Sequence, residues 1–167
     1  MTLTAAERRD RLRLFRTDYV GPATFRGLLA HFGSASAALD ALRDAFGSKV
    51  APLQIAIGAA DSFAGYVDLV HLKAFRWDGK AEVEIPIPAE LEGEVAARRD
   101  QLLEAAAEAD DDVFTKYLDG ATISNEELEA CLHKGVRDLV LAPVLVGSAT
   151  KGIGLEALLD EIGRAHV

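Results

Sequence analysis

The chain has 167 residues, half of them hydrophobic and 27% charged, a composition that excludes an intrinsically disordered protein. No apolar run approaches the roughly 20 residues that span a bilayer, and the first residues lack a signal-peptide pattern, so we expect no membrane segment. The single cysteine, Cys131, excludes an internal disulfide and suits a reducing compartment, so we expect a cytoplasmic location.

The net charge of −9 is unevenly distributed. Residues 1–42 contain six arginines and four acidic residues, a net charge of +2, whereas residues 43–167 contain 12 basic and 23 acidic residues, a net charge of −11. This break in composition near residue 42 predicts two segments of different origin. The four histidines are scattered, with no HExxH motif and no paired cysteines, so we predict no metal site.

The first predicted helix begins at the capping box Thr4-Ala5-Ala6-Glu7 and continues to about Phe15. Its arginines are Arg8, Arg9, Arg11, Arg13 and Arg16. They form either a phosphate-binding surface or a solvated helix face that neighbouring acidic residues balance.

A tight turn at Gly21-Pro22 then leads into a second helix, which presents an apolar face between Phe25 and Phe32 and ends at Gly33. Ser34 or Ser36 caps another short helix. Two helices joined by such a turn form a helix-hairpin-helix pattern.

Over residues 7–42 this pattern resembles the N-terminal module of the DNA-processing protein A family, which acts in DNA uptake and recombination. In such hairpins, amides at the turn can bind a nucleic-acid phosphate. The resemblance implies a weak contact with single-stranded DNA near Gly21, Arg13 and Arg16. A purely structural hairpin is the alternative.

A set of strands follows. The apolar run Val50–Gly58 predicts one strand, in which Pro52 indicates a sheet edge or the first residues of the strand. Residues 65–70 and 71–77 alternate in polarity like half-buried strands, Asp78-Gly79 predicts a hairpin turn, and residues 81–87 form the return strand. Trp77 is expected to cover the apolar face of this sheet.

Three helices are predicted next. Pro88 begins a long helix over residues 89–109, and Asp110-Asp111-Asp112 forms the acidic first turn of a helix over residues 113–118. The capping box Ser124-Asn125-Glu126-Glu127 begins a helix that continues to about Lys134.

The most informative segment is the apolar run Leu139–Val146, which predicts a strand buried on both faces. The small residues Gly147-Ser148-Ala149 follow, and a helix begins at Leu155. In α/β nucleotide-binding folds, ligands bind beyond the carboxyl ends of the strands, where backbone N–H groups of Ser148 and Ala149 would lie. A plain connection between strand and helix is the alternative.

In element order, spacing and motifs, residues 44–160 resemble the GTPase domain of elongation factor G or of a paralogue. The resemblance includes the insert particular to that family and implies an α/β fold: a partial P-loop GTPase-like domain with an α+β insert, preceded by a small helical module. We expect a helical module over residues 1–42, a GTPase-domain fragment over residues 43–160 and a non-native-looking tail over residues 161–167.

The resemblance also implies site residues and partners. Gly147-Ser148-Ala149 matches the family's last guanine-binding motif, in which an amide near Ala149 meets guanine O6 and Ser148 holds the loop. The intact family binds GTP and Mg²⁺, hydrolyses GTP and drives translocation on the ribosome. By the resemblance, the stalk protein of the ribosome would contact the acidic helix predicted over residues 89–109 through Glu90, Glu94 and Asp100. The alternative is that these acidic residues only keep the helix surface solvated.

Three elements of a working GTPase are missing from this sequence. The phosphate loop G-x-x-x-x-G-K-[ST] and the Asn-Lys-x-Asp guanine motif do not occur, and the two matches to Asp-x-x-Gly, at residues 44–47 and 160–163, lie at predicted helix ends and are interpreted as chance. One hydrogen bond contributes about 0.5–1.5 kcal/mol, whereas millimolar affinity needs about 4 kcal/mol. We therefore expect no retained GTP or Mg²⁺, no catalytic residue and no enzymatic activity in this chain.

These features predict the start of one protein joined to the middle of another, with the junction near residues 38–42. The last seven residues look like a translated sequencing adapter. Two origins stay open: a chimeric or truncated chain with no function of its own, and a natural gene fusion.

Overall fold

The computed structural model describes residues 35–164. The chain divides into two compact units, with the boundary between Gly47 and Ser48. The predicted DNA contact at Gly21, Arg13 and Arg16 lies outside the described residues, as do the first two predicted helices and residues 165–167.

The described part of the first unit is helix α3, Ala35–Phe46. Gly47 follows with a φ of +76°, a left-handed conformation that glycine adopts without steric cost and that commonly ends helices. The sequence Asp44-Ala45-Phe46-Gly47 predicts the end of a helix, and the structure confirms this end. A short 3-10 helix, η1 (Gly47–Lys49), leads into the second unit.

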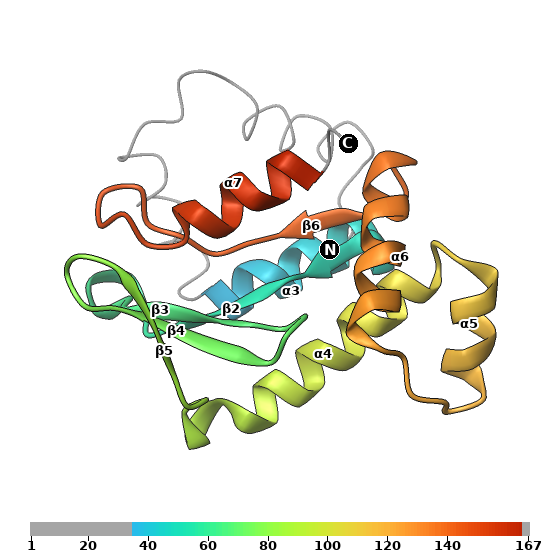
Figure 1. The fold of residues 1–167 in the computed structure, drawn as a ribbon, viewed down its shortest axis with the longest axis horizontal. Coiled ribbons are helices and arrows are strands. Elements are labelled where there is room, and N and C mark those ends of the chain that lie inside the picture. The colour runs from blue at the N-terminus through green and yellow to red at the C-terminus, as the bar shows by residue number, and fades with distance from the viewer. Residues whose placement is uncertain (1–34, 165–167) are drawn as a thin grey trace. The chain divides into compact units, whose positions relative to one another are not determined.

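The second unit contains two sheets (Figure 1). Strands β1 (Val50–Pro52) and β6 (Ala142–Val144) form a parallel pair. The other sheet is antiparallel, in the order β2-β3-β4-β5, with bounds Gln54–Ile57, Gly65–Asp68, Lys73–Trp77 and Glu82–Ile85. A 3-10 helix, η2 (Ala60–Ser62), connects β2 to β3. The hairpin predicted at Asp78-Gly79 is confirmed, because β4 and β5 pair directly across it.

The prediction of one strand over Val50–Gly58 is wrong, because the chain passes from one sheet to the other at Leu53. The Leu53 N–H donates to the carbonyl of Val144 at 2.9 Å, and the Leu53 carbonyl accepts from the N–H of Leu69 at 2.9 Å. Pro52 is the last residue of β1, and the hydrogen bonding to β6 continues through the N–H of the next residue, Leu53. Among the described residues β1 pairs with β6 alone, so Pro52 lies in an edge strand, one of its two predicted positions. One extended segment thus serves two sheets.

The prediction of a strand over Leu139–Val146 buried on both faces is also wrong. Strand β6 covers three residues, of which Ala142 is exposed and the other two are half-buried. Among the described residues β6 pairs with β1 alone, so its other edge has no strand beside it. Leu139 lies before the strand with a φ of +59° and is 87% exposed.

The helices follow the predictions more closely. The long helix begins as a 3-10 turn, η3 (Ala89–Leu91), and continues as α4 (Glu92–Ala107). Helix α5 spans Asp111–Leu118 and α6 spans Asn125–Arg137. Helix α7, Leu155–Arg164, continues past the end of the predicted GTPase-like segment at residue 160. None of the helices within residues 35–164 is long and apolar enough to cross a bilayer.

The cap predicted for α6 is confirmed, whereas α5 begins two residues earlier than predicted, so that Asp110 is its N-cap and only Asp111 and Asp112 lie in its acidic first turn. The Ser124 side chain accepts from the N–H of Glu127, and the Glu127 carboxylate accepts in return from the N–H of Ser124, which completes the capping box. Asp110 caps α5 by accepting from the N–H groups of Asp112 and Val113.

One hydrophobic core joins the antiparallel sheet to α4 and α6. Leu69 from the end of β3, Leu102 from α4 and Leu128 from α6 are completely buried in it. Burying a leucine side chain contributes about 1.5–3 kcal/mol, so these contacts hold both helices on the sheet.

Candidate functional site

The candidate site is the loop from Val146 to Gly154, which connects β6 to α7. Ser148 and Ile153 form an isolated antiparallel bridge: the Ser148 N–H donates to the Ile153 carbonyl at 2.9 Å, and the Ile153 N–H donates to the Ser148 carbonyl at 3.1 Å. The bridge closes a small loop whose tip begins at Ala149.

Two glycines permit this narrow path. A Cβ on Gly147 would lie 3.0 Å from the Ile153 carbonyl oxygen, and one on Gly154 would lie 2.6 Å from the Val146 carbonyl oxygen. Gly154 also has a φ of +76°. A larger residue at either position would push the two arms of the loop apart.

Ser148 organises the tip through several contacts. Its carbonyl accepts from the N–H of Lys151 at 3.2 Å, and its hydroxyl lies 3.3 Å from that of Thr150. The next amide, that of Ala149, donates to no acceptor within the part of the chain that the structure describes. An N–H group held at the tip of a fixed loop is suited to donate to a carbonyl oxygen of a ligand.

The loop is also held by residues that sequence reasoning missed. The half-buried Glu82 on β5 accepts from the Gly154 N–H at 2.7 Å, and the buried Gln54 on β2 accepts from the Val146 N–H at 3.1 Å. Lys151 Nζ donates to the carbonyls of Asp61 and Phe63. No local motif identifies these contacts, because they join segments some 70 to 90 residues apart.

Trp77, at the end of β4, lies beside the same loop. A Cβ on Gly152 would be 3.8 Å from its ring. The ring is therefore next to the loop tip as well as on the sheet, which the sequence-based interpretation of Trp77 did not anticipate.

The three acidic residues predicted to contact a stalk protein do not share one helix face. Glu90 lies in η3 and is exposed, and Asp100 is exposed on α4. Glu94 is half-buried and pairs with Arg98 at 3.8 Å, as its i,i+4 spacing allows. At about 100° per residue, Asp100 lies about 120° around the α4 axis from Glu94.

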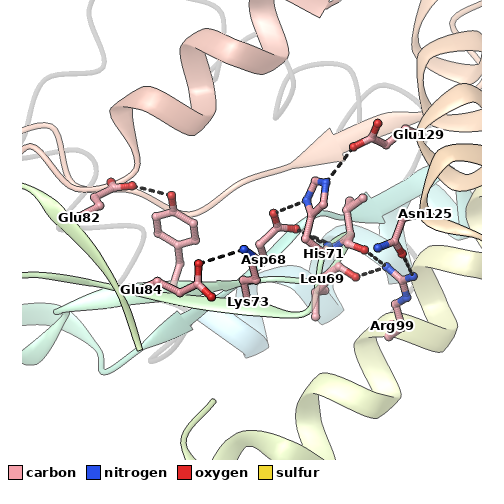
Figure 2. A network of polar contacts seen from close by, with 11 residues as sticks. Asp68, Leu69, His71, Lys73, Glu82, Glu84, Arg99, Asn125 and Glu129 are labelled. Atoms are coloured by element: carbon pink, nitrogen blue, oxygen red, sulfur yellow. Dashed lines mark hydrogen bonds and ion pairs between the residues drawn. The ribbon is translucent and has the colours of Figure 1, made fainter. Parts of the chain in front are cut away.

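A polar network ties the helices to the sheet (Figure 2). His71, after β3, has one ring nitrogen 2.8 Å from Asp68 and the other 3.0 Å from Glu129 on α6. Arg99 on α4 donates to the carbonyls of Leu69 and Val70, and to the Asn125 side chain. These contacts fix α4 and α6 to the segment that follows β3.

A groove of about 630 Å³ lies between α5 and α6. Ion pairs between Lys116 and Glu127 and between Lys134 and Asp110 flank it. Cys131, also in its lining, is buried, and burial raises the pKa of its thiol, so it packs rather than reacts. Within the described ranges, no group of three or more His, Cys, Asp or Glu residues is arranged to hold a metal ion.

Comparison with known proteins gives two different similarities. The model of the DprA-like N-terminal HHH domain matches residues 5–57, a longer stretch than the predicted 7–42. Elongation factor G from a Ureaplasma parvum serovar 3 strain is 38% identical over 127 residues, which is 74% of this chain and 18% of that protein. Elongation factor G from Ureaplasma urealyticum serovar 10 is 37% identical over the same shares.

The fold has a solved relative as well. A crystal structure of a protein from Thermus thermophilus superposes with a TM-score of 0.71 at 33% identity, over 82% of this chain and 21% of that one. The chain spans about a fifth of the length of the proteins it matches. Both predicted resemblances and the predicted fold class are confirmed: the chain combines similarity to the DprA-like HHH domain near its start with similarity to elongation factor G over most of its length.

Proposed function

We propose that the chain is a partial elongation-factor-G-type protein, which supplies the guanine-binding side of a translational GTPase domain together with its insert. The loop from Val146 to Gly154 carries this proposal. Its tip is fixed by the bridge between Ser148 and Ile153, and the Ala149 amide is left to donate. A guanine O6 is an acceptor of the kind that such an amide recognises.

We further propose that this chain neither retains nor hydrolyses GTP. The sequence contains no phosphate loop to bind the phosphates and the Mg²⁺ ion. The hydrogen bond from Ala149 contributes about 0.5–1.5 kcal/mol, well below the roughly 4 kcal/mol of a millimolar complex. In the intact family GTP and Mg²⁺ are the cofactors; here we propose that neither is bound.

Titration of the purified chain with a fluorescent GTP analogue, with and without Mg²⁺, tests this proposal. We expect no saturable signal up to millimolar nucleotide, and the same trace with a fluorescent ATP analogue as the control. Micromolar binding that requires Mg²⁺ would overturn the proposal.

A second candidate function is docking of the ribosomal stalk protein on the acidic helix, which requires no nucleotide. Glu90 and Asp100 are exposed and so available, whereas Glu94 is already paired with Arg98. Exposed charge pairs contribute about 0.2–1 kcal/mol each, so binding would be weak and sensitive to salt. In a chemical-shift titration, shifts unchanged by Glu90→Gln, Glu94→Gln and Asp100→Asn together would exclude this surface.

A third candidate is weak binding of single-stranded DNA, supported by the match of the DprA-like HHH domain to residues 5–57. We expect affinity that falls steeply with salt and decreases in the double variant Arg13→Gln, Arg16→Gln. The exposed Arg76 on β4 provides the matched control, Arg76→Gln. Equal binding by the double variant and the control would refute this function. If the source DNA shows no such reading frame, the chain is instead a chimera without a function of its own.

A further inference from the structure

The carboxylate of Glu82 connects the antiparallel sheet to the loop through both of its oxygens. Oε1 accepts from the Gly154 N–H at 2.7 Å, and Oε2 accepts from the Tyr66 hydroxyl at 2.6 Å. Figure 2 shows the Glu82 side chain with its carboxylate held in the hydrogen bond to this hydroxyl. Gly154 directly follows Ile153, the residue that forms the bridge to Ser148. The carboxylate therefore holds one arm of the loop at the base of its tip.

A second contact holds the tip itself. Lys151 Nζ donates to the Asp61 carbonyl at 2.7 Å and to the Phe63 carbonyl at 3.0 Å, both in the connection between β2 and β3. Every one of these partners belongs to the segment between β2 and β5. Together with the hydrogen bond from the Val146 N–H to Gln54, these contacts fasten the loop at three points to the segment from β2 to β5.

The loop needs such contacts, because its own backbone is permissive. Gly152 and Gly154 have φ values of +77° and +76°, in the region that glycine enters freely. A segment with two such glycines can adopt many conformations unless other groups fix it. If the loop became ordered only when a ligand binds, the lost conformational entropy would weaken the affinity.

We propose that Glu82 is a positioning residue for the guanine-contact loop: by holding Gly154 on the sheet, it sets where the Ala149 amide lies. The hydrogen bonds of Glu82 to Gly154 and Tyr66 do not depend on the identity of the ligand. Guanine as the ligand rests on the proposed function. A charged acceptor suits the role, since hydrogen bonds to ionised groups are roughly twice as strong as neutral ones.

Amide NMR and hydrogen exchange of the whole chain test the inference. Glu82→Ala should displace the resonances of Gly154, Ser148 and Ala149. It should also speed exchange of the Gly154 amide roughly tenfold or more, while Leu128 in the core stays unchanged. Glu84→Ala is the matched control, because Glu84 lies two residues along the same strand and pairs with Lys73 at 3.0 Å instead. It should leave the loop resonances in place.

A conservative variant separates positioning from general stability. Gln at position 82 still offers a carbonyl oxygen to Gly154, so Glu82→Gln should keep the Ala149 resonance and the slow exchange of Gly154. Tyr66→Phe removes one hydroxyl without changing the packing of the ring. Tyr66→Phe should shift the resonances of the same loop amides, by less than Glu82→Ala does. It replaces Glu82→Ala in the test if Glu82→Ala does not fold.

The inference is wrong if Ala149 and Gly154 keep their wild-type shifts and exchange rates in Glu82→Ala, or in Tyr66→Phe if the first variant is unfolded. It is also wrong if Glu84→Ala disturbs the loop to the same extent. None of these readouts uses nucleotide. Failure here leaves the GTP titration unaffected, and micromolar GTP binding would leave the role of Glu82 intact.

Discussion

Asp110 shows how one side chain serves two structural roles. It caps α5 through backbone N–H groups and pairs with Lys134 on α6 at 2.8 Å. The ion pair with Lys134, followed by the hydrogen bond from Val113, lowers the pKa of Asp110. A carboxyl group whose pKa is lower in the folded state stabilises the protein above its unfolded pKa, and this stabilisation is lost as the pH falls.

Asp110→Asn should therefore destabilise the protein at pH 7 and have little effect at about pH 2, because asparagine keeps the cap but loses the charge. Urea denaturation at the two pH values measures this difference. Asp111→Asn, one residue along the exposed start of α5, is the control. Equal destabilisation by Asp110→Asn at both pH values would show that the charge has no role.

Tyr66 is expected to affect the stability of the protein at high pH. Burial, and then the hydrogen bond to Glu82, raise the pKa of Tyr66 well above its usual value of about 10. Its contribution is fully present below the unfolded pKa and is lost as the pH rises above it, since only the unfolded state then ionises readily. Tyr66→Phe should reduce the loss of stability between about pH 9 and about pH 11.5, as denaturant unfolding at a series of pH values would measure. If the free energy of unfolding falls equally with rising pH in Tyr66→Phe and in the wild type, the hydrogen-bonded hydroxyl of Tyr66 does not contribute to this pH dependence.

At the scale of elements, α4 is held on the sheet by more than its apolar face. The sequence predicts that face from Leu91, Val95, Leu102 and Ala106, of which Leu91 is half-buried and the other three are buried. It gives no sign of Arg99, whose guanidinium donates to the carbonyls of Leu69 and Val70 beyond the end of β3. Those carbonyls belong to the turn that connects β3 to β4.

Arg99→Met should lower the free energy of unfolding by about 1–3 kcal/mol, because carbonyls that accept from a partly buried charged donor lose their partner. Arg99→Lys should recover part of the loss, since an ammonium lacks the planar fork of a guanidinium. The exposed Arg76→Met is the control, and denaturant midpoints give the values. A loss no larger than that of the control would mean that the apolar face alone holds α4.

Local rules predict helices in this chain better than sheets, for a physical reason. A cap such as Ser124 with Glu127 is complete within four residues, so the sequence shows it. Strand length depends on distant neighbours: Leu53 separates two strands because Val144 and Leu69 bond its two sides. Strand β6 is short and half-exposed because β1 alone pairs with it among the described residues.

The candidate site also combines a local motif, which the sequence shows, with contacts between distant residues, which it does not. The motif Gly147-Ser148-Ala149 is continuous, so the sequence alone can suggest it, and its guanine-binding role stays a prediction. Glu82 and Lys151 were missed, because the contacts they make to Gly154 and Phe63 exist only after folding.

For the molecule as a whole, we propose that the loop from Val146 to Gly154 is held in place to contact guanine, and that the sequence, which lacks the phosphate-loop motif, supplies no site for the phosphates. GTP then has no advantage over guanosine, because the two ligands differ in the phosphates alone. A complete phosphate site with Mg²⁺ would make the difference very large.

The most direct test is a pair of NMR titrations of the whole chain, one with guanosine and one with GTP and Mg²⁺, followed at the Ala149 amide. We predict that neither ligand reaches saturation at millimolar concentration, and that GTP binds no more tightly than guanosine. Saturable binding of GTP that is about tenfold or more tighter than that of guanosine, and that disappears on removal of Mg²⁺, would show that the chain has a phosphate site.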